Sequence, residues 1–188
     1  MIDAANYLAI ETLRDGRTIT IRAQRPEDLD GWRAALARTS AETLYRRFFA
    51  VKREISEKEA HYFLDIDFVK QVALVADEDG CPTLIGGGRY IVIEPGKAEA
   101  SFALIDDYQA RGIGSALMRH LVAIGREAEI RELVAEVLSD NYPMLRVFED
   151  EHKTRGYCRP RHSALSLIVR GARGRWSRDA SNNEGHHP

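Results

Sequence analysis

The chain has 188 residues, a length that fits one ordinary domain with short tails. Hydrophobic residues make up 44% and charged residues 30%, which excludes a collagen-like repeat, a disulfide scaffold and a wholly disordered chain. The net charge of −2 suggests no polyanionic partner, so we expect no nucleic-acid binding. No apolar run is long enough to span a bilayer, and Asp3 and Glu11 interrupt any signal-peptide pattern, so we expect a cytoplasmic protein without membrane attachment.

The first half of the chain alternates short strands with short helices. Asp15-Gly16 between two apolar segments predicts a two-residue hairpin turn. Ser56 and Glu59 have the spacing of a capping box, which predicts the start of a helix. The predicted strands are 8–14, 17–22, 71–76, 84–93 and 99–105; the predicted helices are about 26–37, 40–49 and a short one after residue 56; and the predicted turns are 77–80 and 95–97.

The second half contains a strand–helix–strand unit. A helix from about residue 112 to 128 separates strands 99–105 and 133–138, for which parallel pairing through a right-handed crossover is expected. A helix at about 142–153 and a strand at 164–169 follow. We therefore assign residues 1–170 to one α/β domain with a single mixed sheet flanked by helices, in which residues 1–11 are an N-terminal extension and first strand. The polar segment 171–188 is predicted to be a disordered tail.

The segment 109–115 is the most informative, because a strand ends, a turn with two glycines follows, and a helix begins. The start of a helix presents unpaired N–H groups and the positive end of the helix dipole, which suit a phosphate. Gly112 and Gly114 let the backbone approach an anion closely, and Arg111 adds a positive charge. The spacing is neither that of a P-loop nor that of a dinucleotide site, since Leu117 replaces the third glycine. A turn without a ligand explains the two glycines equally well.

The flanks of this turn carry a resemblance. Gln109-Ala110-Arg111-Gly112-Ile113-Gly114 resembles the acyl-CoA pyrophosphate motif of the GNAT superfamily of N-acetyltransferases, and 135–141 with Met144 is similar to the segment beside the pantetheine arm of the cofactor. The resemblance implies a GNAT fold with a βαβ core, and acetyl-CoA as co-substrate. Asn141 can equally be a simple helix N-cap. The implied cofactor-binding residues are Leu104, Ile105, Gln109, Ala110, Arg111, Gly112, Ile113, Gly114, Ser115, Asn141 and Met144.

Further segments resemble the bacterial protein lysine acetyltransferase (Pat-like) branch, over about residues 12 to 169. The most distinctive is 40–49; the others are 13–16, Arg22, 25–28, 72–76, Gly86 with Arg89-Tyr90, and 98–100. The resemblance implies a protein lysine as acceptor and an acyl-CoA synthetase-like protein as partner, and it is compatible with a homodimer. Two alternatives stay open: a small-molecule amine as acceptor, and a module that senses acyl-CoA without turning it over.

The chemistry needs a group that accepts the proton of the amine, because a lysine amine has an ordinary pKa of about 10.4. The resemblance implies Glu99 as this catalytic base. Strand alternation places Glu99 on one face with Ser101, Ala103 and Ile105. An ordinary solvent-facing carboxylate is the competing explanation. A backbone N–H group of Leu104 or Ile105 is expected to stabilise the developing oxyanion.

Two departures from the family pattern leave roles unassigned. Phe148 stands where many relatives have a tyrosine, so the usual general acid is missing, and Tyr142, Tyr157 or a water are the remaining candidates. The turn at 151–157, beside the acceptor side, is longer than in the family pattern. The helix at 46–49 is expected to line the acceptor side. The two cysteines have no metal-type spacing, and we expect no metal.

Overall fold

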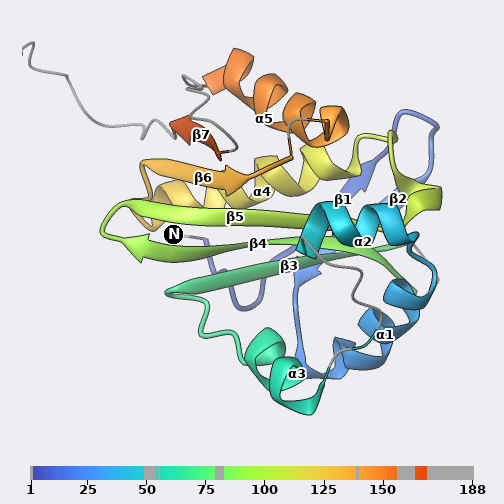
Figure 1. Cartoon of the computed structure of the whole chain (residues 1–188). Coiled ribbons are helices and arrows are strands. Elements are labelled where there is room, and N and C mark those ends of the chain that lie inside the picture. The colour runs from blue at the N-terminus through green and yellow to red at the C-terminus, as the bar shows by residue number, and fades with distance from the viewer. Residues whose placement is uncertain are drawn as a thin grey trace, which may run out of the picture.

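The computed structural model describes residues 2–48, 54, 56–78, 83–138, 140–155 and 164–168. Within these residues, seven strands form one sheet whose order follows the chain from β1 to β7 (Figure 1). All neighbours are antiparallel except β5 and β6, which run parallel. The predicted mixed sheet is confirmed. The strands are β1 Leu8–Thr12, β2 Thr18–Ala23, β3 Gln71–Glu78, β4 Leu84–Glu94, β5 Lys97–Leu104, β6 Glu132–Glu136 and β7 Ala164–Ile168.

Helices cover both faces of this sheet, as two adjacent glycines of β4 show. A side chain at Gly87 would meet Trp32 of the first helix, whereas one at Gly88 would meet Phe102 and Leu121, the latter on the long helix before β6. Because successive strand residues point to opposite faces, the two helices lie on opposite sides. The described helices are α1 Leu29–Ala37, α2 Ala41–Phe48, α3 Glu57–Leu64, α4 Ile113–Glu127 and α5 Tyr142–Arg155, with short 3-10 turns η1 Pro26–Asp28 and η2 Asp106–Tyr108.

Local signals placed several boundaries correctly. The Ser56 hydroxyl accepts from the Glu59 N–H group, and the Glu59 carboxylate accepts from the Ser56 N–H group, so the predicted capping box forms. The apolar stripe of α4 is buried against the sheet, and β5, α4 and β6 form the predicted parallel unit. No helix among the described residues has the length and apolar character needed to cross a membrane. The predicted tail at 171–188 lies outside the described residues.

Two turn predictions were wrong. The first hairpin has a three-residue loop, because Leu13 N–H donates to the Arg17 carbonyl at 2.7 Å and Gly16 has φ +83°. Asp77 and Glu78, the first half of the turn predicted at 77–80, belong to β3 instead, and residues 79–80 lie outside the described residues. A long-range ion pair explains this extension: Arg22 of β2 donates to the Asp77 carboxylate at 2.7 Å, and no local pattern reveals that contact.

Candidate active site

The loop before α4 has the backbone that its sequence predicts. Gly112 precedes the helix with φ +90° and ψ 0°, a left-handed conformation that favours glycine. The Ala116 N–H group donates to the Gly112 carbonyl at 3.0 Å, so helical bonding begins there and the preceding N–H groups face the loop. A side chain at Gly112 would meet no atom within 4 Å, whereas one at Gly114 would press on Val147 of α5. Gly112 therefore leaves open space at the start of α4, and Gly114 allows close helix packing.

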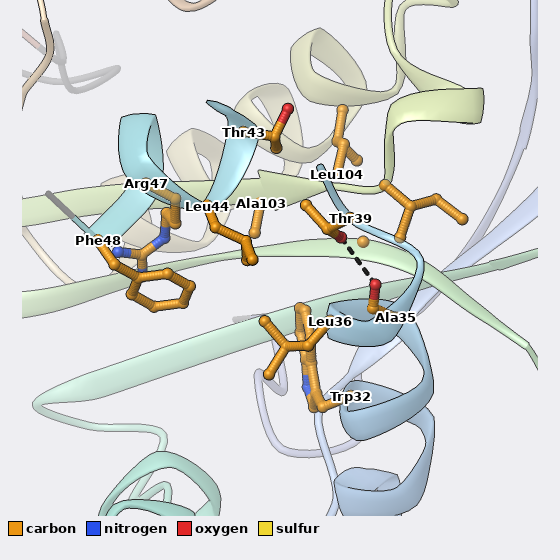
Figure 2. Close-up of a pocket in the computed structure, with 12 residues that line it drawn as sticks. Trp32, Ala35, Leu36, Thr39, Thr43, Leu44, Arg47, Phe48, Ala103 and Leu104 are labelled. Atoms are coloured by element: carbon orange, nitrogen blue, oxygen red, sulfur yellow. Dashed lines mark hydrogen bonds between the residues drawn. The ribbon is translucent and has the colours of Figure 1, made fainter. Parts of the chain in front are cut away.

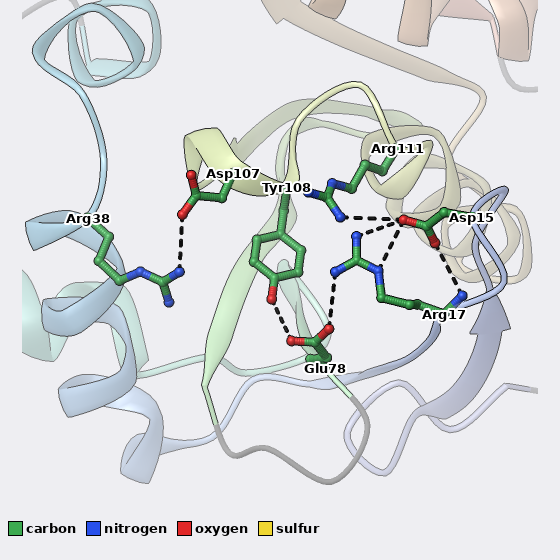
Figure 3. Close-up of polar contacts among 7 residues, drawn as sticks. All are labelled: Asp15, Arg17, Arg38, Glu78, Asp107, Tyr108 and Arg111. Carbon is green, nitrogen blue, oxygen red and sulfur yellow. Dashed lines mark hydrogen bonds and ion pairs between the residues drawn. The ribbon is translucent and has the colours of Figure 1, made fainter.

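Arg111 is held in place by a charged network (Figure 3). Its guanidinium lies 3.4 Å from the Asp15 carboxylate and 5.2 Å from the centre of the Tyr108 ring. Asp15 also pairs with Arg17, and this contact holds the pKa of Asp15 below its ordinary value. Arg17 in turn pairs with Glu78, which accepts from the Tyr108 hydroxyl. The first hairpin thus positions the one arginine of the loop, a role the sequence did not indicate.

Two side chains next to the loop anchor α2 rather than point outward. Gln109 donates to the Thr43 hydroxyl at 3.1 Å and to the Leu104 carbonyl at 3.3 Å. Asp106 accepts from the Ser40 N–H and hydroxyl groups at 2.7 Å and from the Thr43 hydroxyl at 2.8 Å. Burial works against ionisation of Asp106, yet these hydrogen bonds outweigh it and lower the pKa of the carboxyl group. The loop and the start of α2 therefore form one unit.

The parallel strands β5 and β6 part close to this loop. Their pairing covers only three positions and ends where Glu99 pairs with Val134. The Ile105 N–H group donates to the Ile85 carbonyl of the neighbouring chain segment at 3.1 Å. Because N–H groups alternate along a strand, the Leu104 N–H group points to the other edge, where β5 has left β6. Of the two predicted oxyanion donors, only Leu104 has its N–H group directed to that edge.

Glu99 stands where the two strands part, and its exposed side chain lines a pocket of about 350 Å³. Ser101 and Ala103 line the same pocket, so the predicted shared face is confirmed for these three residues, whereas the fourth, Ile105, is buried and lines an adjoining cavity. Their cross-strand partners Ile91, Arg89 and Gly87 complete its floor. We call this cavity the acceptor pocket. Its cover comes from all three helices on this face, through Trp32 and Leu36 of α1, Arg47 and Phe48 of α2, and Tyr62 and Phe63 of α3.

A second, smaller cavity adjoins the acceptor pocket at the end of β5. It measures about 20 Å³ and shares with the pocket the side chains of Trp32, Leu36, Arg47, Phe48 and Ala103. Figure 2 shows Arg47 and Phe48 directed from α2 toward the sheet. The cavity reaches Leu104, so space continues from the acceptor pocket toward the start of α4. The helix predicted to line the acceptor side does so through Arg47 and Phe48, whereas Arg46 pairs with Glu42 at 2.6 Å.

Two arginines, Arg47 and Arg89, and two carboxylates, Glu59 and Glu99, are the charged residues that line the acceptor pocket. Arg47 donates to the Ser101 hydroxyl at 3.0 Å, and Arg89 donates to the Phe63 carbonyl at 2.6 Å. Burial lowers the pKa of Arg47, and the charge of Glu99 opposes that decrease. Burial together with the charge of Arg47 lowers the pKa of Arg89 to about 10. Sequence reasoning assigned no role to Arg89, because an arginine in an apolar strand shows no sign of what covers it.

Asn141 acts as the N-cap of α5, a role that can coexist with the predicted contact to the cofactor. Its side-chain oxygen accepts from the Met144 N–H group at 3.4 Å, as an N-cap does, and Met144 packs against the core. Phe148 is only 1% exposed and belongs to that core. The position of the usual tyrosine is therefore a packing position here. Tyr142 is 68% exposed, and Tyr157 lies outside the described residues.

Known proteins share this fold and these segments. The crystal structure of the GNAT domain of S. lividans PAT is similar to 85% of this chain and 94% of that domain, with a TM-score of 0.76 and 33% identity. A Pseudomonas aeruginosa protein named Acetyltransferase PA5475 is 35% identical over 127 residues, which are 66% of this chain and 68% of that protein. Acetyltransferase Pat of Mycolicibacterium smegmatis is 30% identical over 73% of this chain, which spans only 41% of the length of Pat.

A mixed sheet with one parted parallel pair, next to a glycine turn at a helix start, defines an α/β protein that binds a phosphate-bearing cofactor. The family model described as Acetyltransferase (GNAT) family matches residues 38–153. The chain belongs to this family. It is an N-acetyltransferase that uses acetyl-CoA, and the alternative of a sensing module without catalysis is not supported. Among the described residues, no group of three or more metal-binding side chains is present.

Proposed function

We propose that the chain transfers the acetyl group of acetyl-CoA to the side-chain amine of a protein lysine, with Glu99 as the base. The observation that carries this proposal is the place of Glu99, at the last paired position of β5 and β6 and on the floor of the acceptor pocket. The likeness to proteins named Pat and PAT supports a protein acceptor. An acyl-CoA synthetase-like partner and a homodimer are part of this proposal.

The residues before α4 fit the pyrophosphate of acetyl-CoA. Gly112 offers a left-handed turn with open space around it, and the N–H groups at the helix start face that space. Arg111 adds a positive charge from the side. Ile113 and Ile105 are buried, so they contribute backbone atoms only. When bound, acetyl-CoA supplies a thioester whose acetyl group is open to attack by an amine.

The proton steps belong to residues of this chain. Glu99 accepts a proton from the acceptor amine, directly or through a water, so that the nitrogen lone pair is free to attack. The Leu104 N–H group donates to the carbonyl oxygen as it gains negative charge, a role that its position beyond the last β5/β6 pair supports. Phe148 has no proton to give to the departing sulfur. Tyr142, an exposed tyrosine six residues before it, is the described residue that we propose for this step.

A small-molecule amine is a second candidate acceptor, and one observation favours it. The acceptor pocket of about 350 Å³ lies in the size range of small-ligand sites, and three helices cover it.

The test is release of free CoA thiol from acetyl-CoA with a panel of lysine peptides and small amines. Glu99→Gln is expected to lower kcat by at least about 100-fold at neutral pH, within the range for general-base catalysis. Glu94→Gln is the matched control, because Glu94 is an exposed carboxylate of the neighbouring strand that pairs with Lys97. Absence of thiol release with every amine would overturn the proposal.

A further inference from the structure

Arg89 is a buried cation on the central strand of the sheet. The residue is 7% exposed and comes from the central strand β4, yet among the described residues no carboxylate forms an ion pair with it. Its guanidinium stacks on the ring of Phe63 at 3.9 Å and donates to the Phe63 carbonyl. An arginine has five N–H donors in a planar fork, and this contact uses one nitrogen of that fork. The group is therefore held firmly while donors remain for a ligand.

Arg47 brings a second positive charge to the same place. Its side chain projects from α2, and the Nη2 atom donates to the hydroxyl group of Ser101. Ser101 of β5 is the cross-strand partner of Arg89 of β4. Among the described residues it too forms no ion pair, although the charge of Glu99 acts on it. Two cations that are largely removed from water and lie near each other are costly unless an anion joins them. Ser101 adds a hydroxyl group between the two.

The register of the sheet fixes the spacing of this pair from the proposed base. Arg89 pairs with Ser101, and Glu99 lies two residues farther along β5 on the same face. Diagonal neighbours of this kind are about 7–8 Å apart at the backbone. One compact molecule can therefore place an amine at Glu99 and a negatively charged group at the arginines.

We propose that Arg47 and Arg89 form an anion subsite in the acceptor pocket, which binds a carboxylate carried by the same acceptor that presents the amine. This inference rests on the proposed function for the amine, but carboxylate binding can be measured without turnover. A free amino acid and an acidic residue beside an acceptor lysine both supply this chemistry, and the experiment separates these two sources.

The experiment compares acceptors that differ only in charge. The first arm compares kcat/KM for 3-aminopropanoate and 5-aminopentanoate with kcat/KM for their carboxamides. The second arm compares kcat/KM for lysine peptides that have Asp beside the lysine with kcat/KM for the same peptides with Asn there. We expect at least a tenfold preference for the carboxylate in one of the arms, and the arm identifies the source. In Arg47→Gln and Arg89→Lys this preference, taken as the ratio of kcat/KM for the charged and uncharged acceptor within each variant, is expected to fall toward one. Arg46→Gln is the control, because Arg46 neighbours Arg47 on α2 but pairs with Glu42 instead.

A binding measurement distinguishes failure of the anion subsite from failure of the proposed acetyl transfer. Melting temperatures with saturating CoA are compared on adding N-acetyl-3-aminopropanoate or its amide. A larger shift with the carboxylate that is lost in Arg47→Gln supports the subsite even if no amine is acetylated, in which case only the proposed function fails. Equal kcat/KM and equal shifts for the charged and uncharged members would overturn the subsite while leaving the proposed function intact.

Discussion

Replacement of Gly112 by alanine separates the cost of backbone strain from the loss of cofactor binding. Gly112 has φ +90°, and an L-residue in this region costs about 1–2 kcal/mol. The new methyl group meets no protein atom within 4 Å, so no clash adds to that cost. For a chain of this length, 1 kcal/mol shifts Tm by about 2–4 °C, so Gly112→Ala is expected to melt about 2–8 °C below the wild type.

Gly96→Ala is the matched control. Gly96 has φ +79° in the turn between β4 and β5, at the end of β5 away from the loop, and its nearest contact is the flexible Arg131 side chain at 3.4 Å. Both variants should therefore lose similar stability. In contrast, only the methyl group at residue 112 lies where the backbone must approach a pyrophosphate.

The assay is the Tm shift on adding acetyl-CoA, with ATP as a comparison ligand. At 100 times its Kd, a ligand stabilises the folded state by about 2.7 kcal/mol, and a tenfold weaker Kd reduces this to about 1.4 kcal/mol. Gly112→Ala is expected to lose at least half of the stabilisation that acetyl-CoA gives, whereas Gly96→Ala keeps it. If the two variants respond to acetyl-CoA alike, the loop before α4 is not the pyrophosphate site.

Three further predictions concern stability. Tyr90→Phe should cost nothing at pH 7, because the buried hydroxyl has no hydrogen-bond partner among the described residues. Burial raises the pKa of Tyr90 to about 12, so the folded state holds the phenol proton more tightly than the unfolded state and the free energy of unfolding falls as pH rises from 10 to 12. Urea unfolding of Tyr90→Phe should lack that alkaline decline of up to about 3 kcal/mol. Arg22→Met leaves the carboxylates of Asp77 and Asp28 without the guanidinium that contacts each of them at 2.7 Å, and it should lower the free energy of unfolding by about 3 kcal/mol. A decrease of less than about 1 kcal/mol contradicts this. Asp106→Asn should lower the free energy of unfolding at pH 7 and do so less and less as pH falls, since the lowered pKa of Asp106 gives stability that is lost on protonation; a pH-independent cost contradicts it.

Most signals that act within a few residues were interpreted correctly, although Asp15-Gly16 lies in a three-residue loop and not in the predicted two-residue turn. The capping box at Ser56 and the apolar stripe of α4 need only local spacing, and both formed as predicted. The turn expected at Asp77 failed because its carboxylate is bound by Arg22, 55 residues earlier. Turn-forming residues are weak predictors where a distant partner satisfies their polar groups.

In the candidate site, too, local features could be predicted from the sequence and long-range contacts could not. The loop around Gly112 was visible because glycines at a helix start have a direct backbone meaning. The anchoring of α2 by Asp106 and the pairing of Arg89 with Arg47 in one pocket depend on packing between distant segments. Gln109 illustrates the limit of a motif, because its side chain bonds to Thr43 and the end of β5.

The pH dependence of acetyl transfer to a lysine peptide, measured as kcat for the wild type, Glu99→Gln and Glu94→Gln, tests the account most directly. We predict that the wild type and Glu94→Gln keep high rates down to neutral pH. Glu99→Gln should be at least about 100-fold slower there and recover as pH rises toward the pKa of the free amine. Equal rates for Glu99→Gln and the wild type at pH 7 would contradict the assignment of Glu99 as the base.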